Sequence, residues 1–184
     1  MRTKTILLIT AILFSLTAKG QEKVGKLDFR IGCGVSLLGS GDMTTFVYEN
    51  ELNYKINNYL TSAVSINLGR SNYGAYENSA FTQGNLNILL SPFKNNKKSD
   101  FRIGTGLTYY TVSDAYITSS SYRNGQVVDV VYNIESRNSY GINVVIENTS
   151  RISDKLFWGA KLYSQPYFNG DINTGILLKL GMKI

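Results

Sequence analysis

Histidine is absent from this sequence of 184 residues, and Cys33 is its only cysteine. Without histidine the chain cannot build a Ser-His-Asp or Cys-His nucleophile system, or a His-ligated zinc or iron site. A single cysteine excludes an internal disulfide and a Cys-rich metal centre. We therefore expect a protein that is not an enzyme, with no catalytic residues, no cofactor and no metal site.

Long apolar runs are also scarce. The one clear run covers residues 6–16 (ILLITAILFSL), and its eleven residues fall short of the roughly 20 that a membrane-spanning helix needs. Arg2 and Lys4 precede it, and Ala18 and Gly20 follow with the small side chains of a cleavage site. This pattern predicts a secretory signal peptide over residues 1–20, with an uncleaved anchor as the alternative. Residues 21–184 would then form one domain.

The net charge of +6 is a weak indication of a nucleic-acid partner. It falls to +3 once residues 1–20 are removed, because that segment holds three basic residues and no acid. Nucleic-acid affinity depends on many Lys and Arg contacts to phosphates, so we expect no nucleic-acid partner.

The remaining chain alternates between apolar and polar residues with the period of a β-strand. In residues 27–37 every odd position is apolar and every even position is polar or glycine. Related alternation predicts eight strands, at residues 27–37, 46–56, 60–68, 85–90, 101–109, 140–147, 158–163 and 172–184. We see no amphipathic helix after residue 20. Short connections after the even strands and longer ones after the odd strands are typical of an outer-membrane barrel.

Alternation alone does not say which face meets water. Three features favour a membrane orientation, with the polar face inward: this face is rich in glycine, it carries charges of both signs, and aromatic residues gather near both strand ends. One aromatic group flanks the short turns (Tyr54, Tyr59, Phe93, Phe101, Trp158), and the other flanks the longer loops (Phe46, Tyr48, Phe81, Tyr109, Tyr140). Cys33 falls on the lipid-facing side.

Charged residues on the polar face predict an ion-pair network inside the barrel, since a buried charge without a partner costs several kcal/mol. Its expected members are Asp28, Arg30, Glu49, Glu51, Lys55, Arg102, Glu147, Lys161, Lys179 and Lys183. The motif Phe-Arg-Ile-Gly-x-Gly occurs at residues 29–34 and again at 101–106, so Arg30 and Arg102 should enter from opposite walls, with the glycines making room for them. The glutamates could instead form a hydrolytic carboxylate pair, but ion pairing is preferred.

The longest polar connection, residues 113–137, is the most suggestive functional segment. Residues 126–134 have strand character, and Asn124-Gly125 is a typical hairpin turn. The fifth and sixth strands should therefore project as a ribbon, and its candidate interaction residues are Tyr116, Tyr122, Asn124 and Tyr132. An exposed strand edge can bind a protein by strand addition, although a solvated loop without a partner is the alternative.

On these patterns the chain resembles the small eight-stranded outer-membrane barrels of Gram-negative bacteria (the OmpX/OmpA type) over residues 22–184. Leu178, Leu180, Met182 and Ile184 match the alternating last strand that the insertion machinery reads in that family, although family members usually end in an aromatic residue. The resemblance implies an all-β, eight-stranded antiparallel up-and-down transmembrane β-barrel, with both termini in the periplasm.

The expected function is a structural, adhesion or surface-interaction role in the outer membrane. Expected partners are outer-membrane lipid, the insertion machinery and an extracellular protein, and a monomer is expected. Two alternatives stay open. A small-solute channel would need an uncharged lumen, and a soluble lipocalin-like barrel binding an apolar ligand would need the apolar rows to face inward. An eight-stranded barrel is just wide enough for side chains to fill it, which predicts a plugged interior.

Overall fold

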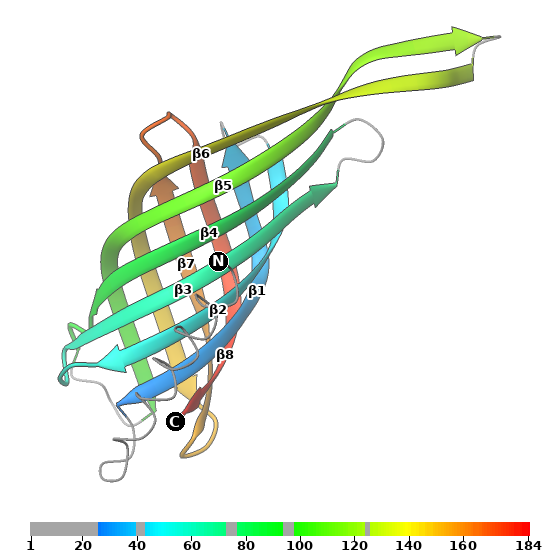
Figure 1. Cartoon of the computed structure of the whole chain (residues 1–184). Helices are drawn as coiled ribbons and strands as arrows, with labels where there is room; N and C mark the ends of the chain where they lie inside the picture. The colour runs from blue at the N-terminus through cyan, green and yellow to red at the C-terminus, as the bar shows by residue number, and fades with distance from the viewer. Residues whose placement is uncertain (1–25, 40–42, 73–76, 94–97, 124–125) are drawn as a thin grey trace, which may run out of the picture.

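Eight antiparallel strands form a closed barrel in which each strand pairs with its neighbours in sequence and β1 pairs with β8 (Figure 1). The computed structural model describes residues 26–39, 43–72, 77–93, 98–123 and 126–184. The strands are β1 (Leu27–Gly39), β2 (Met43–Lys55), β3 (Leu60–Asn72), β4 (Glu77–Leu90), β5 (Ser99–Arg123), β6 (Gln126–Arg151), β7 (Leu156–Pro166) and β8 (Ile172–Lys183). The predicted fold class is confirmed.

Six of the strands have 11 to 14 residues, enough for the 9–11 that a tilted transmembrane strand requires. Most extend beyond their predicted bounds. As a result the connections at residues 40–42 and 73–76 are no longer than those at 56–59 and 91–98, and the predicted alternation of loop lengths is wrong. In the described residues no helix is long and apolar enough to cross a membrane.

The asymmetry of the barrel comes from β5 and β6 instead. They have 25 and 26 residues, and Figure 1 shows them leaving the barrel together at one end. We call this end the ribbon end. The opposite end, the turn end, holds the connections 56–59, 91–98 and 152–155 together with Ile184. The projecting ribbon was predicted from the sequence, whereas residues 1–20 and the Asn124-Gly125 turn lie outside the described residues.

The distribution of side chains is the inverse of that in a water-soluble protein. Glu49 and Glu147 are 0% exposed inside the barrel, whereas Leu107 and Leu178 are 67% and 65% exposed on its outer wall. Unpaired charges are costly to bury and large apolar patches rarely face water, so the outer wall is suited to lipid. The predicted inward and outward rows are confirmed on all eight strands.

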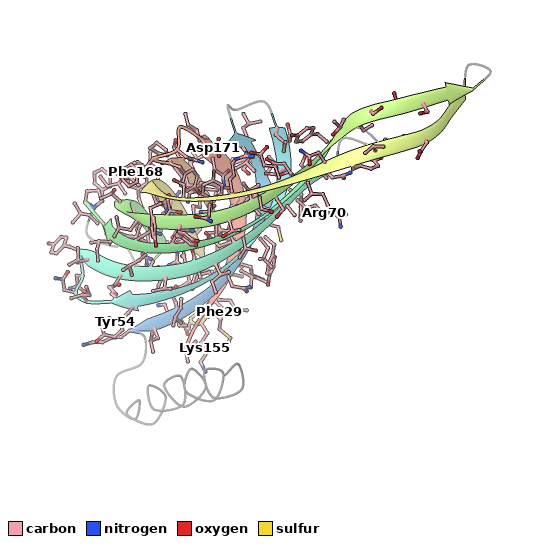
Figure 2. The ribbon with its side chains drawn as sticks, turned by 45° about the horizontal axis from the view of Figure 1, so that its top comes forward. Phe29, Tyr54, Arg70, Lys155, Phe168 and Asp171 are labelled. Carbon is pink, nitrogen blue, oxygen red and sulfur yellow. The ribbon has the colours of Figure 1, made fainter. Side chains whose placement is uncertain are left out.

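Aromatic side chains lie on the outer wall near both ends, as in a bilayer-spanning barrel. Figure 2 shows Phe29 and Tyr54 near the turn end and Phe168 near the ribbon end. The rings of Tyr109 and Tyr140 pack 4.8 Å apart on neighbouring strands. Phe81 does not belong to this set: it is only 3% exposed and faces the interior, because its odd position on β4 points inward and Gly69 leaves space for its ring.

Candidate functional site: the barrel interior and the ribbon

Six charged side chains form a cluster in the middle of the barrel, three acids and three bases. Lys161 on β7 places its Nζ 2.6 Å from Oε2 of Glu49 and 2.8 Å from Oε2 of Glu51 on β2. Lys179 on β8 places its Nζ 2.7 Å from Oε1 of Glu51 and 3.1 Å from Oε2 of Glu147 on β6. Because β2 and β7 are not neighbours in the barrel, these ion pairs cross its interior.

Arg30 joins this cluster to the turn end. Its Nε lies 2.6 Å from Oδ1 of Asp28, and its Nη1 donates a hydrogen bond to Glu147 on β6. Its guanidinium also stacks over Phe157, 4.8 Å from the ring centroid. The ring of Phe157 fits because residue 181 is glycine: a Cβ there would lie 2.2 Å from Phe157 Cε2. Gly181 therefore makes room for Phe157 and also for Arg30 itself, whose Cγ would lie 3.0 Å from such a Cβ.

Arg102 was expected to pair with an acid of the predicted network, but the acid nearest to it is not a member of that network. Its nearest acid is Asp100, whose Oδ2 lies 2.8 Å from its Nε, whereas Asp28 and Glu147 lie 4.0 Å away. Asp100 was not among the predicted residues, although the signal was present: the repeat begins one residue earlier, as Asp28-Phe-Arg30 and Asp100-Phe-Arg102. Residues two apart on a strand share a face, so each arginine has its own aspartate.

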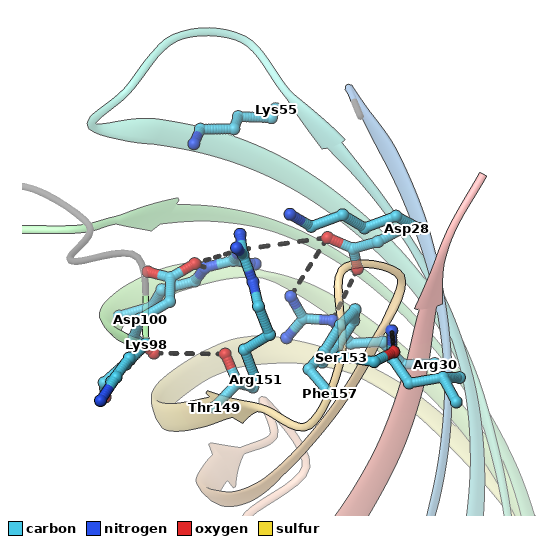
Figure 3. Close-up of a pocket in the computed structure, with 13 residues that line it drawn as sticks. Asp28, Arg30, Lys55, Lys98, Asp100, Thr149, Arg151, Ser153 and Phe157 are labelled. Carbon is cyan, nitrogen blue, oxygen red and sulfur yellow. Dashed lines mark hydrogen bonds and ion pairs between the residues drawn. The ribbon is translucent and has the colours of Figure 1, made fainter. Parts of the chain in front are cut away.

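The motif glycines do not make room for the arginines as predicted, because a Cβ at Gly32 or Gly34 would first meet β8 and Glu49 and not Arg30, and the second copy differs in the same way. Side chains of β4 take that space: a Cβ at Gly104 would lie 2.5 Å from Leu89 Cδ2, and one at Gly106 would lie 2.4 Å from Asn87 Oδ1. Lys55 and Lys183 also differ from the expectation, because the structure places neither in an ion pair with a described acid. Both instead line a cavity at the turn end (Figure 3).

Neutral polar side chains fill the interior closer to the ribbon end. Asn85 accepts hydrogen bonds from Gln83 at 2.8 Å and from Gln165 at 3.1 Å, and Asn173 donates to Gln83 at 3.0 Å. Asn143 donates to Asn87 across β5 at 2.8 Å. Amides can donate and accept at once, so they bond to one another where no charge is available, although Asn87 Nδ2, Asn143 Oδ1 and Asn173 Oδ1 have no hydrogen-bond partner in the described structure. This amide network was not predicted from the sequence.

A second charged cluster, the rim cluster, lies at the base of the ribbon, and sequence reasoning missed it. Arg137 on β6 binds Asp114 on β5, and its Nε lies 2.8 Å from Oδ2 of Asp171 in the β7–β8 connection. Tyr110 donates a hydrogen bond to the same Asp171 oxygen. Burial opposes ionisation of Asp171, but the hydrogen bonds from Tyr110 and Arg137 outweigh it and lower the pKa of this carboxyl below its ordinary value.

The ribbon consists of residues 117–123 of β5 and 126–132 of β6. The last β4 residue paired with β5 is Glu77, opposite Tyr116, so β5 loses its outer neighbour there. The ladder between β6 and β7 begins at Val144, with one bridge at Gly141. Residues 126–139 of β6 therefore pair with β5 on one side and have no strand on the other side in the described structure.

The predicted interaction residues do not form one patch. Tyr116 is paired with Asn133 and Tyr132 with Ile117, and neighbouring pairs point to opposite faces of the ribbon. Tyr116 accepts a hydrogen bond of 2.8 Å from Asn133. Asn124 and the side chain of Tyr122 lie outside the described structure. The exposed apolar residues of the β6 edge are instead Val131, Tyr132 and Ile134.

A closed eight-stranded barrel with a charged interior and an apolar outer wall defines a small transmembrane β-barrel. No family model matches the sequence, and comparison with curated proteins gives no match. Solved structures of outer-membrane proteins do match the fold. Neisserial surface protein A matches with a TM-score of 0.67 and 12% identity, over 89% of this chain and 100% of that chain.

Two further matches have the same architecture. The attachment invasion locus protein Ail of Yersinia pestis has a TM-score of 0.60 and 14% identity, over 88% of this chain and 100% of that one. A major outer membrane protein from Thermus thermophilus has a TM-score of 0.62 and 11% identity, over 86% of this chain and 99% of that one. The fold is thus that of the small outer-membrane barrels, as the sequence resemblance predicted.

Proposed function

We propose that this protein is a non-enzymatic integral protein of the outer membrane that binds an extracellular protein through its ribbon. Residues 1–20 direct export and are removed, both termini lie in the periplasm, and the ribbon extends outside the cell. An even number of strands supports this orientation, because it places both ends of the barrel domain on the side from which an exported chain inserts.

The observation that carries the proposal is the unpaired edge of β6. A lone strand edge offers backbone N–H and C=O groups to an extended segment of another protein, and its side chains select among partners. Val131 and Tyr132 are exposed on opposite faces of this edge, and Ile134 is 71% exposed. Large apolar side chains held in water beyond the barrel are best explained by a surface that a partner covers.

The Ail structure determined in complex with the heparin analogue sucrose octasulfate suggests a second kind of ligand for such barrels. Residues 113–140 of this chain hold three acids and two bases, so the segment has no excess of positive charge. A polysulfated ligand needs such an excess. The ribbon of this protein is therefore suited to a protein segment and not to a polyanion.

The interior supports a plugged barrel over the rival small-solute channel. The ion pairs of Lys161 and Lys179 cross the lumen, and the amide network of Asn85, Gln83 and Gln165 lies next along the axis. A channel would need a continuous hydrated path through these side chains. We propose that the interior is structural and that solutes do not pass through it.

The binding proposal is tested with the full chain folded in detergent and an array of short extended peptides rich in Val, Thr and Tyr. We expect binding, and a loss of about tenfold or more when residues 117–132 are replaced by Asn-Gly or when Ile134 is changed to Lys, because the edge and its apolar side chain are removed. Ile152→Lys, at a similarly exposed isoleucine of the turn end, is the matched control. Equal binding by all four proteins would overturn the proposal.

A further inference from the structure

A cavity of about 200 Å³ opens at the turn end of the barrel, and its walls are strongly basic (Figure 3). This volume corresponds to roughly six or seven water molecules, at about 30 Å³ each. Six cations line it: Arg30, Lys55, Lys98, Arg102, Arg151 and Lys183. Only two carboxylates, Asp28 and Asp100, line it with them.

The two carboxylates are already neutralised. Asp28 pairs with Arg30 and Asp100 with Arg102. Lys55, Lys98, Arg151 and Lys183 form no ion pair with a described acid, although Asp154 and Asp28 act on Lys183 as opposite charges from a distance. Lys55, Arg151 and Lys183 line the same cavity, so their like charges converge on one space. Four positive charges are thus left facing the cavity.

A buried donor in the wall also lacks a partner. Arg102 is 4% exposed, and its Nη1 forms no hydrogen bond within the described structure, while its Nε and Nη2 are held by Asp100. Leaving a buried donor without a hydrogen bond costs free energy, and the cost is greater for a charged group. An anion in the cavity could accept this bond and at the same time offset the repulsion among the surrounding cations.

We propose that this cavity, the basic mouth, binds a phosphate group from the periplasmic side. A phosphate monoester carries about −1.5 to −2 charge at pH 7 and three acceptor oxygens, whereas a carboxylate carries one charge and two oxygens. The phosphate therefore matches four uncompensated cations better than a carboxylate does, and it can also accept a hydrogen bond from Arg102 Nη1, which lies 4.0 Å from Glu147 Oε1 and forms no hydrogen bond with it. The group is a phosphate monoester, from a soluble phosphate or from the monoester headgroup of phosphatidic acid in the inner leaflet.

The proposal is tested by titrating inorganic phosphate into the full chain folded in zwitterionic detergent, followed by ³¹P NMR. We expect saturable binding that weakens with added salt, and a loss of affinity of about tenfold in Arg151→Gln, because one charge-assisted contact is removed. Lys155→Gln is the matched control. It removes one positive charge from the same turn, but Lys155 does not line the cavity and lies at the outside of the turn end (Figure 2).

The triple variant Lys55→Gln, Lys98→Gln, Arg151→Gln should abolish binding while still migrating as a folded barrel in an unheated gel. Equal affinity of Arg151→Gln and Lys155→Gln, or acetate binding as tightly as phosphate, would overturn the proposal. Native mass spectrometry then distinguishes the two sources: retention of phosphatidic acid by the wild type and not by the triple variant assigns a lipid headgroup, and absence of retained lipid assigns a soluble phosphate.

Discussion

At the scale of single residues, the interior of this barrel depends on how charges are partnered. Glu147 forms ion pairs with Arg30 on β1 and with Lys179 on β8, so this one carboxylate offsets part of the positive charge of each buried cation. Glu49 and Glu51 share Lys161 and Lys179 in the same way. Removing one member of such a cluster leaves an opposite charge buried with too few partners, which is more damaging than removing a whole pair.

We therefore expect Glu147→Gln to lower the free energy of unfolding by about 3–5 kcal/mol, because Arg30 and Lys179 remain buried with one acid fewer. Equilibrium unfolding in urea, with the chain in lipid vesicles, measures this value. Glu135→Gln removes the same charge from an exposed position on β6 and should change stability by less than about 0.5 kcal/mol. A similar small effect of both substitutions would contradict the ion-pair cluster.

At the scale of elements, the ribbon is held where it leaves the barrel. The rim cluster links Asp114 of β5, Arg137 of β6 and Asp171 of the β7–β8 connection, and Ser79 of β4 donates a hydrogen bond to Asp114. Four separate segments therefore meet at the base of the two long strands. Beyond this point, register shifts between Ile117 and Ser119 and between Ser121 and Tyr122 interrupt the ladder, which bends and twists a strand pair.

The rim cluster predicts that the base of the ribbon loosens in acid. The pKa of Asp171 is lowered in the folded protein, so its contribution to stability is complete above the ordinary aspartate pKa of about 3.9 and is lost as the pH falls through the lower folded value. Amide hydrogen exchange at residues 134–139, corrected for the intrinsic pH dependence, should lose protection below that range.

Asp171→Asn provides the matched control for this pH effect, because its amide keeps the size of the side chain but has no proton to gain in this range. The variant should have a loosened base at neutral pH and little further change in acid. A pH dependence identical to that of the wild type would assign the effect to other carboxylates.

At the scale of the whole molecule, closure of the sheet removes strand edges within the lipid, because every barrel strand pairs on both sides there. The longest unpaired edge in the described structure lies on β6 beyond the barrel, and β5 has a shorter one beyond Tyr116. The polar interior and apolar wall are both consequences of this closure. The charged groups have one another as partners inside, and the apolar rows need lipid outside.

This arrangement predicts a heat-modifiable protein that does not conduct ions. The chain expressed with residues 1–20 should fractionate with the outer membrane, and its gel band should shift on boiling, because the closed barrel resists detergent until heated. In planar bilayers we expect no steady conductance from the same preparation, since side chains fill the interior. Discrete channel openings would support the small-solute channel instead, and a soluble, unshifted protein would overturn the membrane assignment.

Much of this architecture was predictable from local pattern. The two opposed rows and the number of strands follow from period-two alternation, because neighbouring side chains on a strand must point to opposite faces. The glycines, the charges of both signs and the aromatic residues favoured the polar row as the inner one, and the strand character of residues 126–134 indicated the projection of β5 and β6. The strand ends were harder to predict: polar residues that continue β3 and β4 past the apolar rows look like loop in the sequence. Phe81 was misplaced for a related reason, since an aromatic residue near a strand end fits either face.

The sequence by itself determined that this chain forms strands with one apolar and one polar face, and that the polar face holds nearly balanced charge. Alternation did not determine which face is inside, because the same alternation suits a soluble barrel and a membrane barrel; the tertiary structure confirmed the inward polar face that the other sequence features favoured. It also decided the partners of each charge. Lys161 meets Glu49 across the lumen and Arg137 meets Asp171 at the rim only because closure and register bring distant strands together. Contacts across a lumen depend on where the opposite wall lies, and no local pattern carries that information.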